Sequence, residues 1–142
     1  MVQRTVVFKK QFVTKSSARR QLIDITSEVT RFVHESNVHE GICIISVPHA
    51  TAAVIANEHE NGLLNDMLAR IEALFPKLGT YQHNAIDDNA DAHVAAAFLG
   101  HGRTFPISDG ALVRGTWQNI FLVELDGPRS RREVIMQAIG DE

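Results

Sequence analysis

The chain opens with two short runs rich in β-branched and aromatic residues, "RTVVFKKQFV" (4–13) and "RQLIDI" (20–25). This composition is typical of strands. The polar segment "TKSSAR" between them predicts a hairpin connection. Near the C-terminus, apolar and other residues alternate in "REVIMQAIG" (132–140), which favours a strand over a short helix.

Helical spacing replaces the strand pattern at three places. From Thr26 the apolar residues Val29, Phe32 and Val33 fall on one helical face, and this helix should end near "ESNVHEG" (35–41). The segment "NADAHVAAAFLG" predicts an apolar helix that begins near Asn89. The strongest signal is "NGLLNDMLARIEALF" (61–75), whose apolar stripe consists of Leu63, Leu64, Met67, Leu68, Ile71, Leu74 and Phe75.

The middle and the end of the chain predict further strands. "GICIISV" (41–47) is a continuous apolar run, which indicates a strand buried on both faces, and "TAAVIAN" (51–57) predicts its hairpin partner. "RTFPIS", "GALVRG" and "WQNIFLVEL" follow, separated by glycine-containing turns. The order ββαββα followed by several strands lacks the strict alternation of a parallel α/β fold. We therefore expect one α+β domain, residues 1–142, with a mainly antiparallel sheet.

Composition narrows the class of protein. With 44% hydrophobic and 22% charged residues, the chain has the composition of an ordinary globular protein. Its net charge of -3 does not suggest a broad basic surface for nucleic acid. We find no signal peptide, and no apolar run approaches the roughly 20 residues that span a bilayer. The predicted location is the cytoplasm, without a membrane partner. The single cysteine, Cys43, lies among aliphatic residues and is predicted to be a buried strand residue rather than a nucleophile.

The segment "YQHNAIDDNADAH" (81–93) concentrates histidine and aspartate just before an apolar helix. Part of this polarity suits a helix start, because Asp88 or Asn89 can cap free amides and Asp91 favours the positive end of the helix dipole. These roles leave His83 and His93 unexplained.

Imidazole is a common ligand of zinc and similar ions, and nearby carboxylates orient it or act as bases. His49, His83 and His93, with Asp88, would suffice for an open catalytic metal site, although their spacing matches no short zinc motif. The remaining histidines, His34, His39, His59 and His101, are interpreted as surface or turn residues.

A second polar cluster occurs in "SVPHATAAVIANEHE" (46–60). Hairpin geometry would bring His49 and the pair Asn57–Glu58 to the same rim, where sites are commonly built. Ordinary surface loops would also explain these residues.

Two further features leave alternatives open. Trp117, followed by Gln118, is either a core anchor or the wall of a ligand pocket. Arg129, Arg131 and Arg132 follow a Gly-Pro turn, and they either bind a phosphate or form a solvated, charged strand end.

Five segments, in this order, resemble the YjbQ family, also described as the secondary thiamine-phosphate synthase family: "HATAAVIANE", "YQHN", "DDNADAH", "GTWQ" and "GPRSRR". The resemblance implies a two-sheet β-sandwich of about seven strands with two helices (ββαββαβββ), assembled as a homotrimer. It also implies weak thiamine-phosphate synthase activity, a transferase reaction. Ala50 stands where the family commonly has Ser or Thr, which removes one possible hydrogen bond to a ligand.

The same resemblance assigns the site residues by type. Metal ligands would be His49, His83 and His93; catalytic residues would be Asn57, Glu58 and Asp88; ligand-binding residues would be Thr51, Trp117, Gln118, Arg129 and Arg131.

The leading hypothesis is an enzyme that acts on a phosphorylated small molecule. A divalent metal, zinc or magnesium, would polarise a phosphate oxygen, Asp88 or Glu58 would be the base, and the arginines would neutralise phosphate charge. Acid–base chemistry by His83 or His93 without metal is a variant. The alternatives are a non-catalytic module that binds metal or a phosphometabolite, and a polar cluster that only stabilises trimer contacts.

Overall fold

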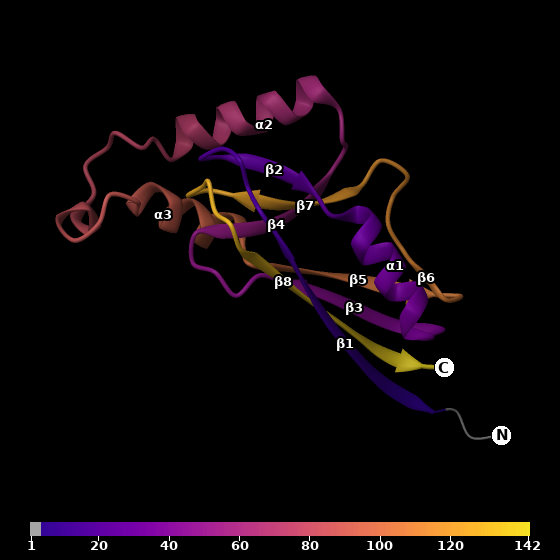
Figure 1. Cartoon of the computed structure of the whole chain (residues 1–142). Helices are drawn as coiled ribbons and strands as arrows, with labels where there is room; N and C mark the ends of the chain where they lie inside the picture. Colours follow the sequence, from indigo (N-terminus) through magenta and orange to yellow (C-terminus); the bar gives the residue numbers. More distant parts are fainter. Residues whose placement is uncertain (1–3) are drawn as a thin grey trace.

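The computed structural model describes residues 4–142, which form two antiparallel sheets with α-helices against them (Figure 1). The elements follow in the order β1 (Thr5–Thr14), β2 (Gln21–Asp24), α1 (Thr26–Ser36), β3 (Glu40–Ser46), β4 (Ala52–Asn57), α2 (Asn61–Leu74), the 3₁₀ helix η1 (Gln82–Ala85), α3 (Ala90–Leu99), β5 (Gly102–Ser108), β6 (Ala111–Leu112), β7 (Asn119–Glu124) and β8 (Arg132–Asp141). The α+β prediction is confirmed. The implied total of two helices is wrong, because α3 is a third helix within the described residues.

The strands are distributed over the two sheets in a way that the local pattern does not predict. The larger sheet has the order β1-β8-β3-β5-β6 and the smaller one the order β2-β7-β4. The predicted hairpins β1–β2 and β3–β4 are therefore wrong, since the two strands of each pair lie in different sheets. β1 pairs instead with β8 along its whole length, from Thr5 opposite Asp141 to Thr14 opposite Arg132. Pairing between strands so distant in sequence is selected by burial in the whole domain, not by turn chemistry.

The main core lies between the sheets and α1. Val29, Phe32 and Val33 of α1 are buried as their spacing predicts, and Phe32 stacks on Phe8 of β1 with ring centroids 5.4 Å apart. Cys43 of β3 is fully buried, and burial raises the pKa of its thiol to about 12, so its interpretation as an inert strand residue is confirmed.

β3 is not buried on both faces. Cys43 and Ile45 point into the core, whereas Ile42 on the other face is 42% exposed. The apolar run alone cannot distinguish this strand from one covered on both sides.

A smaller core cluster holds α3 against the smaller sheet. Ala92, Ala95 and Ala96 of α3 pack with Ala53 of β4 and Val123 of β7. Their short side chains let the helix approach the strands closely. α2 lies along β2 on the outside of the same sheet (Figure 1) and buries fully only Ile71 of its predicted apolar stripe.

Gly41→Ala should destabilise the fold. Gly41 of β3 pairs with Gly140 of β8, and a Cβ at position 41 would lie 2.1 Å from the carbonyl oxygen of Ile139. Because backbone atoms cannot move aside cheaply, the free energy of unfolding in urea should fall by about 1–3 kcal/mol. The control is Gly62→Ala, whose Cβ would meet only the flexible Glu60 carboxylate and which should change the stability by less than about 1 kcal/mol. Equal stability of both variants would contradict this explanation.

Candidate functional site

The predicted site residues separate into two groups at opposite ends of the smaller sheet. One group lies near the start of β4 and the other near its end. The first comprises His49, Thr51, His83, Asp88, His93, Arg129 and Arg131; the second comprises Asn57, Glu58, Trp117 and Gln118. A strand rises by about 3.3 Å per residue, so the six residues of β4 place the two ends of the sheet about 20 Å apart. The prediction that His49 and Asn57–Glu58 share a rim is wrong, because His49 precedes β4 and Asn57 ends it, so the length of this strand separates them.

Histidines from three segments line one open hollow at the first end. His49 lies in the β3–β4 loop, His93 on α3, and His101 just after α3. We call this hollow, of about 490 Å³, the histidine pocket. Its other walls are Val47, Pro48, Ala50, Ala52, Ala96 and Ala97. His101 is an exposed residue of the α3–β5 connection, which agrees with its interpretation as a surface or turn residue, and the position of this connection places it at the hollow.

His49 is held in one tautomer. The backbone N–H of Glu133 donates to its Nε2 at 2.8 Å, so Nε2 carries the lone pair and the proton of the neutral ring is on Nδ1. Burial, followed by the positive charge of Arg132, lowers the pKa of His49 below its ordinary value. Both effects favour the neutral ring, which presents an N–H donor at Nδ1.

His83 and His93 contact each other edge to face, with ring centroids 4.9 Å apart. His83 lies on the exposed η1, and it is His93 that reaches the histidine pocket. Across residues 4–142, no group of three His, Cys, Asp or Glu side chains is arranged to hold a metal ion. The Nε2 lone pair of His49 already accepts a hydrogen bond. These donors do not fit the three-histidine site in this arrangement, and the divalent metal stays a prediction.

A buried ion pair supports the loop that carries His49. Glu124 is fully buried, and the Arg132 side chain is 4% exposed. Arg132 Nε donates to Glu124 Oε1 at 3.0 Å, and Nη2 donates to both the carbonyl oxygen and Oγ1 of Thr51 at 3.0 Å. Burial alone would raise the pKa of Glu124, but hydrogen bonds from Arg132 and Ser16 outweigh it and lower this pKa. Thr51, predicted as a ligand-binding residue, thus contributes its oxygen atoms to an internal network.

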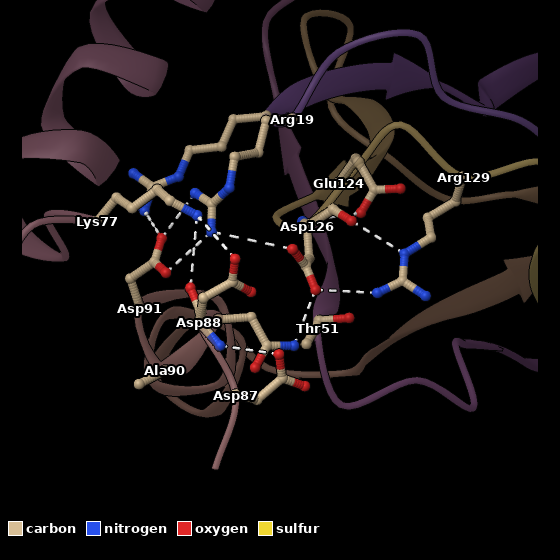
Figure 2. A network of polar contacts seen from close by, with 12 residues as sticks. Arg19, Thr51, Lys77, Asp87, Asp88, Ala90, Asp91, Glu124, Asp126 and Arg129 are labelled. Carbon is tan, nitrogen blue, oxygen red and sulfur yellow. Dashed lines mark hydrogen bonds and ion pairs between the residues drawn. The ribbon is translucent and has the colours of Figure 1, made fainter. Parts of the chain in front are cut away.

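A second network anchors the start of α3 (Figure 2). Asp91 is 1% exposed and accepts two hydrogen bonds from Arg19, at 2.8 and 2.9 Å, and one from Arg20 at 2.6 Å. Asp91 therefore does more than complement the helix dipole, because it joins α3 to the start of β2. His93 follows two residues later, so this clamp fixes the helix that carries it.

Asn89 occupies the N-cap position of α3, but its side chain does not cap the helix. It turns to Asp126 and donates from Nδ2 at 2.9 Å, while Asn84 Oδ1 accepts from the backbone N–H of Ala90 at 3.3 Å. Asp126 also pairs with Arg129 at 2.9 Å (Figure 2). The predicted side-chain cap is wrong, because the bond to the neighbouring loop takes its place.

Two other predicted site residues of this end face solvent. The Asp88 side chain is 88% exposed, with Lys77 at 4.0 Å as its ion-pair partner. Arg131 is 67% exposed and lies 3.6 Å from Glu133. Neither residue belongs to the walls of the histidine pocket.

At the opposite end the predicted residues make mainly local contacts. Asn57 Oδ1 accepts from the backbone N–H of Glu58 at 2.8 Å, and Gln118 Oε1 accepts from that of Gly115 at 2.7 Å. Trp117 is 70% exposed, which excludes its interpretation as a core anchor.

The fold and the pocket define an α+β protein with two antiparallel sheets and an open, histidine-lined hollow beside its third helix. The family described as UPF0047 protein YjbQ-like matches residues 10–141, and the chain belongs to this YjbQ family. No helix of residues 4–142 is long and apolar enough to cross a membrane.

Relatives of known sequence and structure support the same assignment. The UPF0047 protein of Methanothermobacter thermautotrophicus is 43% identical over 126 residues, 89% of this chain and 88% of that protein. YugU of Bacillus subtilis is 33% identical over 86% of this chain and 92% of its own length. The crystal structure of a YbjQ-like protein of unknown function from Sulfolobus solfataricus has a TM-score of 0.95 at 47% identity and covers 96% of this chain and 99% of that one.

Glu124→Gln should lower the free energy of unfolding most at neutral pH. The variant leaves Arg132 buried without a counter-ion, so the free energy of unfolding should fall by about 3–5 kcal/mol. Because the folded-state pKa of Glu124 is lowered, the stabilisation by its carboxylate is complete above the unfolded-state pKa and is lost as the pH falls through the folded-state pKa. The difference in the free energy of unfolding between the unsubstituted protein and Glu124→Gln should therefore become smaller as the pH falls. Urea unfolding at several pH values measures this difference.

The matched control is Glu35→Gln, which removes an exposed pair with Lys10 and should leave the stability nearly unchanged. A difference between the protein and Glu124→Gln that stays constant at every pH would show that the Glu124 carboxylate does not stabilise the fold in this way.

Proposed function

We propose that the chain is an enzyme that binds a phosphorylated small molecule in the histidine pocket and uses imidazole groups for proton transfer. The observation that carries the proposal is the convergence of His49, His93 and His101 on one open hollow. Histidine exchanges protons near neutral pH, and an imidazole held in a defined tautomer is suited to directed hydrogen bonding.

The pocket residues have different roles in this proposal. Neutral His49 donates from Nδ1 to an oxygen of the substrate, since its Nε2 is occupied by the Glu133 amide. His93, in contact with His83, is the group that gives or takes a proton. The wall at Ala50 lacks the hydroxyl that a Ser or Thr would supply, so this chain holds its substrate with one hydrogen bond fewer there.

A phosphorylated substrate would meet charges of both signs at this end of the sheet. Burial and the positive charges of Arg132 and Arg129 lower the pKa of His49, and the negative charges of Glu133 and Glu124 raise it. Both arginines are paired with carboxylates, Glu124 and Asp126. The phosphate in this proposal therefore rests on the hydrogen-bond donors of the pocket histidines and on the family resemblance.

The family resemblance makes thiamine-phosphate synthesis the first reaction to test. In that transfer, the thiazole nitrogen forms a C–N bond with the pyrimidine methylene carbon as the C–O bond to pyrophosphate breaks. Hydrogen bonds from His49 and His93 would stabilise the departing pyrophosphate. The competing hypothesis is a module that binds the phosphorylated molecule without reaction.

The homotrimer is part of the proposal. The outer lobe runs from the end of α2 through the α2–α3 connection, on the left of Figure 1, to the end of α3. It carries large apolar side chains in water: Leu74 is 71% exposed, Leu78 93%, Ile86 86% and Phe98 78%. Exposed apolar groups gathered on one part of a protein commonly mark a contact surface. Other copies of the chain are the proposed partners.

His93→Gln and His49→Gln should each reduce the condensation of the pyrimidine pyrophosphate with the thiazole phosphate by about 100-fold or more, the usual contribution of a positioned acid–base group. Single-turnover kinetics with purified protein is the measurement. His34→Gln, at an exposed position on α1, is the control and should retain full activity.

Binding of either substrate without turnover would favour the non-catalytic module. Activity that is lost with EDTA and restored by zinc or magnesium would favour the metal mechanism over proton transfer by histidine. Activity that survives both histidine substitutions would place the site elsewhere.

Phe98→Ser combined with Leu74→Ser should dissociate the trimer, because both side chains belong to the exposed apolar lobe. Sedimentation equilibrium should report three copies of the 15.7 kDa chain before the substitutions and a single copy after them. Val7→Ser, at a 57% exposed position on β1 of the other sheet, is the control and should leave the assembly unchanged. A monomeric unsubstituted protein would contradict the predicted assembly.

A further inference from the structure

The connection between β6 and β7 is an ordered loop that exposes a tryptophan to water. We call residues 113–118 the tryptophan loop; Trp117 is 70% exposed and Val113 is 45% exposed. The backbone N–H of Val113 donates to the carbonyl oxygen of Pro106 at 2.8 Å, and that of Gln118 donates to the carbonyl oxygen of Gly115 at 3.0 Å. Neither contact uses the indole. A loop that is fixed in this way and presents a tryptophan is typical of a binding surface, since tryptophan is enriched among the residues that dominate interfaces.

The histidine pocket lacks the kind of wall that this loop carries. Its lining residues are three histidines and small apolar groups, and none of them is Phe, Tyr or Trp. Ligand pockets enclose most of their ligand and are rich in aromatic side chains, whereas this hollow is open. Trp117 of the same chain cannot close it. It lies two residues before Asn119, which pairs with Asn57 at the far end of β4, about 20 Å from the pocket end. A closing wall has to come from another molecule.

The proposed homotrimer provides that molecule. In a ring of three copies, each contact joins two different surfaces of the chain. The exposed apolar lobe is one such surface, and it is continuous with the pocket, because Ala97 lines the pocket and the next residue of α3, Phe98, belongs to the lobe. A copy that covers the lobe therefore lies at the mouth of the pocket. Figure 1 shows the lobe on the left and the β6–β7 connection on the right, so these two surfaces can meet head to tail around a ring.

The two surfaces also carry opposite charges. In the tryptophan loop, Arg114 uses Nη1 for a carbonyl oxygen of its own loop, and its Nε and Nη2 donors make no hydrogen bond within residues 4–142. Beside the pocket, Asp87 and Asp88 are exposed. A hydrogen bond from the Asp88 backbone lowers the pKa of Asp87. The charges of His83 and His93 lower this pKa further, so the carboxylate lies near the histidine pair. An arginine on one surface and carboxylates on the other favour this pairing over contacts between like surfaces.

We propose that the tryptophan loop of one copy docks at the histidine pocket of the next, so that the partner's Trp117 forms the missing wall and the partner's Arg114 approaches Asp87 and Asp88. The inference rests on the proposed homotrimer and adds to the proposed function a second chain as part of each site. It gives Trp117, which the family resemblance assigns to ligand binding, a route to the histidines that a single chain does not provide.

The fluorescence of Trp117 tests whether assembly buries the indole, because it is the only tryptophan of the chain. In the trimer, the acrylamide quenching constant should be about threefold or more lower than in the dissociated Leu74→Ser/Phe98→Ser variant, because the core of an interface excludes water. Equal quenching in the two proteins would overturn the proposal. If the double variant does not fold, the cross-linking experiment decides, because it uses the assembled protein.

Cross-linking tests where the loop docks. Two differently tagged chains are co-expressed, one with Thr116→Cys in the tryptophan loop and one with Ala97→Cys at the pocket wall. A bismaleimide much shorter than β4 should join them into a covalent pair of both tags, resolved by denaturing electrophoresis. The native Cys43 is buried, and burial raises the pKa of its thiol to about 12, so it should not react.

The matched control pairs Val7→Cys, at an exposed position of β1, with Ala97→Cys and should give no covalent pair. Coupling through position 7 but not through position 116 would assign the contact to the outer face of the larger sheet and overturn the proposal, as would coupling of neither. Both readouts need no substrate, so a failure of the proposed catalysis leaves them unchanged. An active trimer without the cross-link through position 116 would refute this contact alone.

Discussion

The carboxylate of Glu124 and the guanidinium of Arg132 meet in the interior, where both ions are removed from water. Glu124 ends β7 of the smaller sheet, and Arg132 begins β8 of the larger one, so the pair joins the two layers. Arg132 also binds the oxygen atoms of Thr51 before β4, and Ser16 donates to Glu124 from the loop that follows β1. Removing either ion would leave the other uncompensated, so the crossing of the chain between the sheets depends on this contact.

The position of the histidine pocket follows from that crossing. The residue after Arg132 is Glu133, and its backbone N–H holds His49 in a single tautomer. The partner histidine, His93, is placed by a different ionic contact, in which Asp91 joins α3 to Arg19 and Arg20. Two buried carboxylates, each compensated by arginine, thus support the two sides of one pocket. At the opposite end of the smaller sheet lies a third, partly buried carboxylate, Asp24, for which a histidine and neutral donors replace arginine.

Much of the local structure was predictable because it depends on neighbours in sequence. The helical spacing of Val29, Phe32 and Val33 marked α1, and the alternation in residues 132–140 marked β8. The pairing of strands was not predictable from turns, since β1 and β2 are consecutive and still belong to different sheets. The fold brings His49 and His93 to one hollow, whereas Asn57 and Glu58, which the sequence analysis grouped with His49, lie at the other end of β4.

The sequence by itself determined the family, the α+β class, the positions of most helices and strands and the types of residue available for chemistry. These properties reside in short motifs and in hydrophobic periods that each segment carries on its own. Only the tertiary structure decided which polar residues are internal and which are exposed, because that depends on contacts between distant segments. Arg132 looks like Arg129 and Arg131 in the sequence, yet it is the one that is buried against Glu124. His59 looks like any surface histidine until the fold places Asp24 beside it, 35 residues away along the chain.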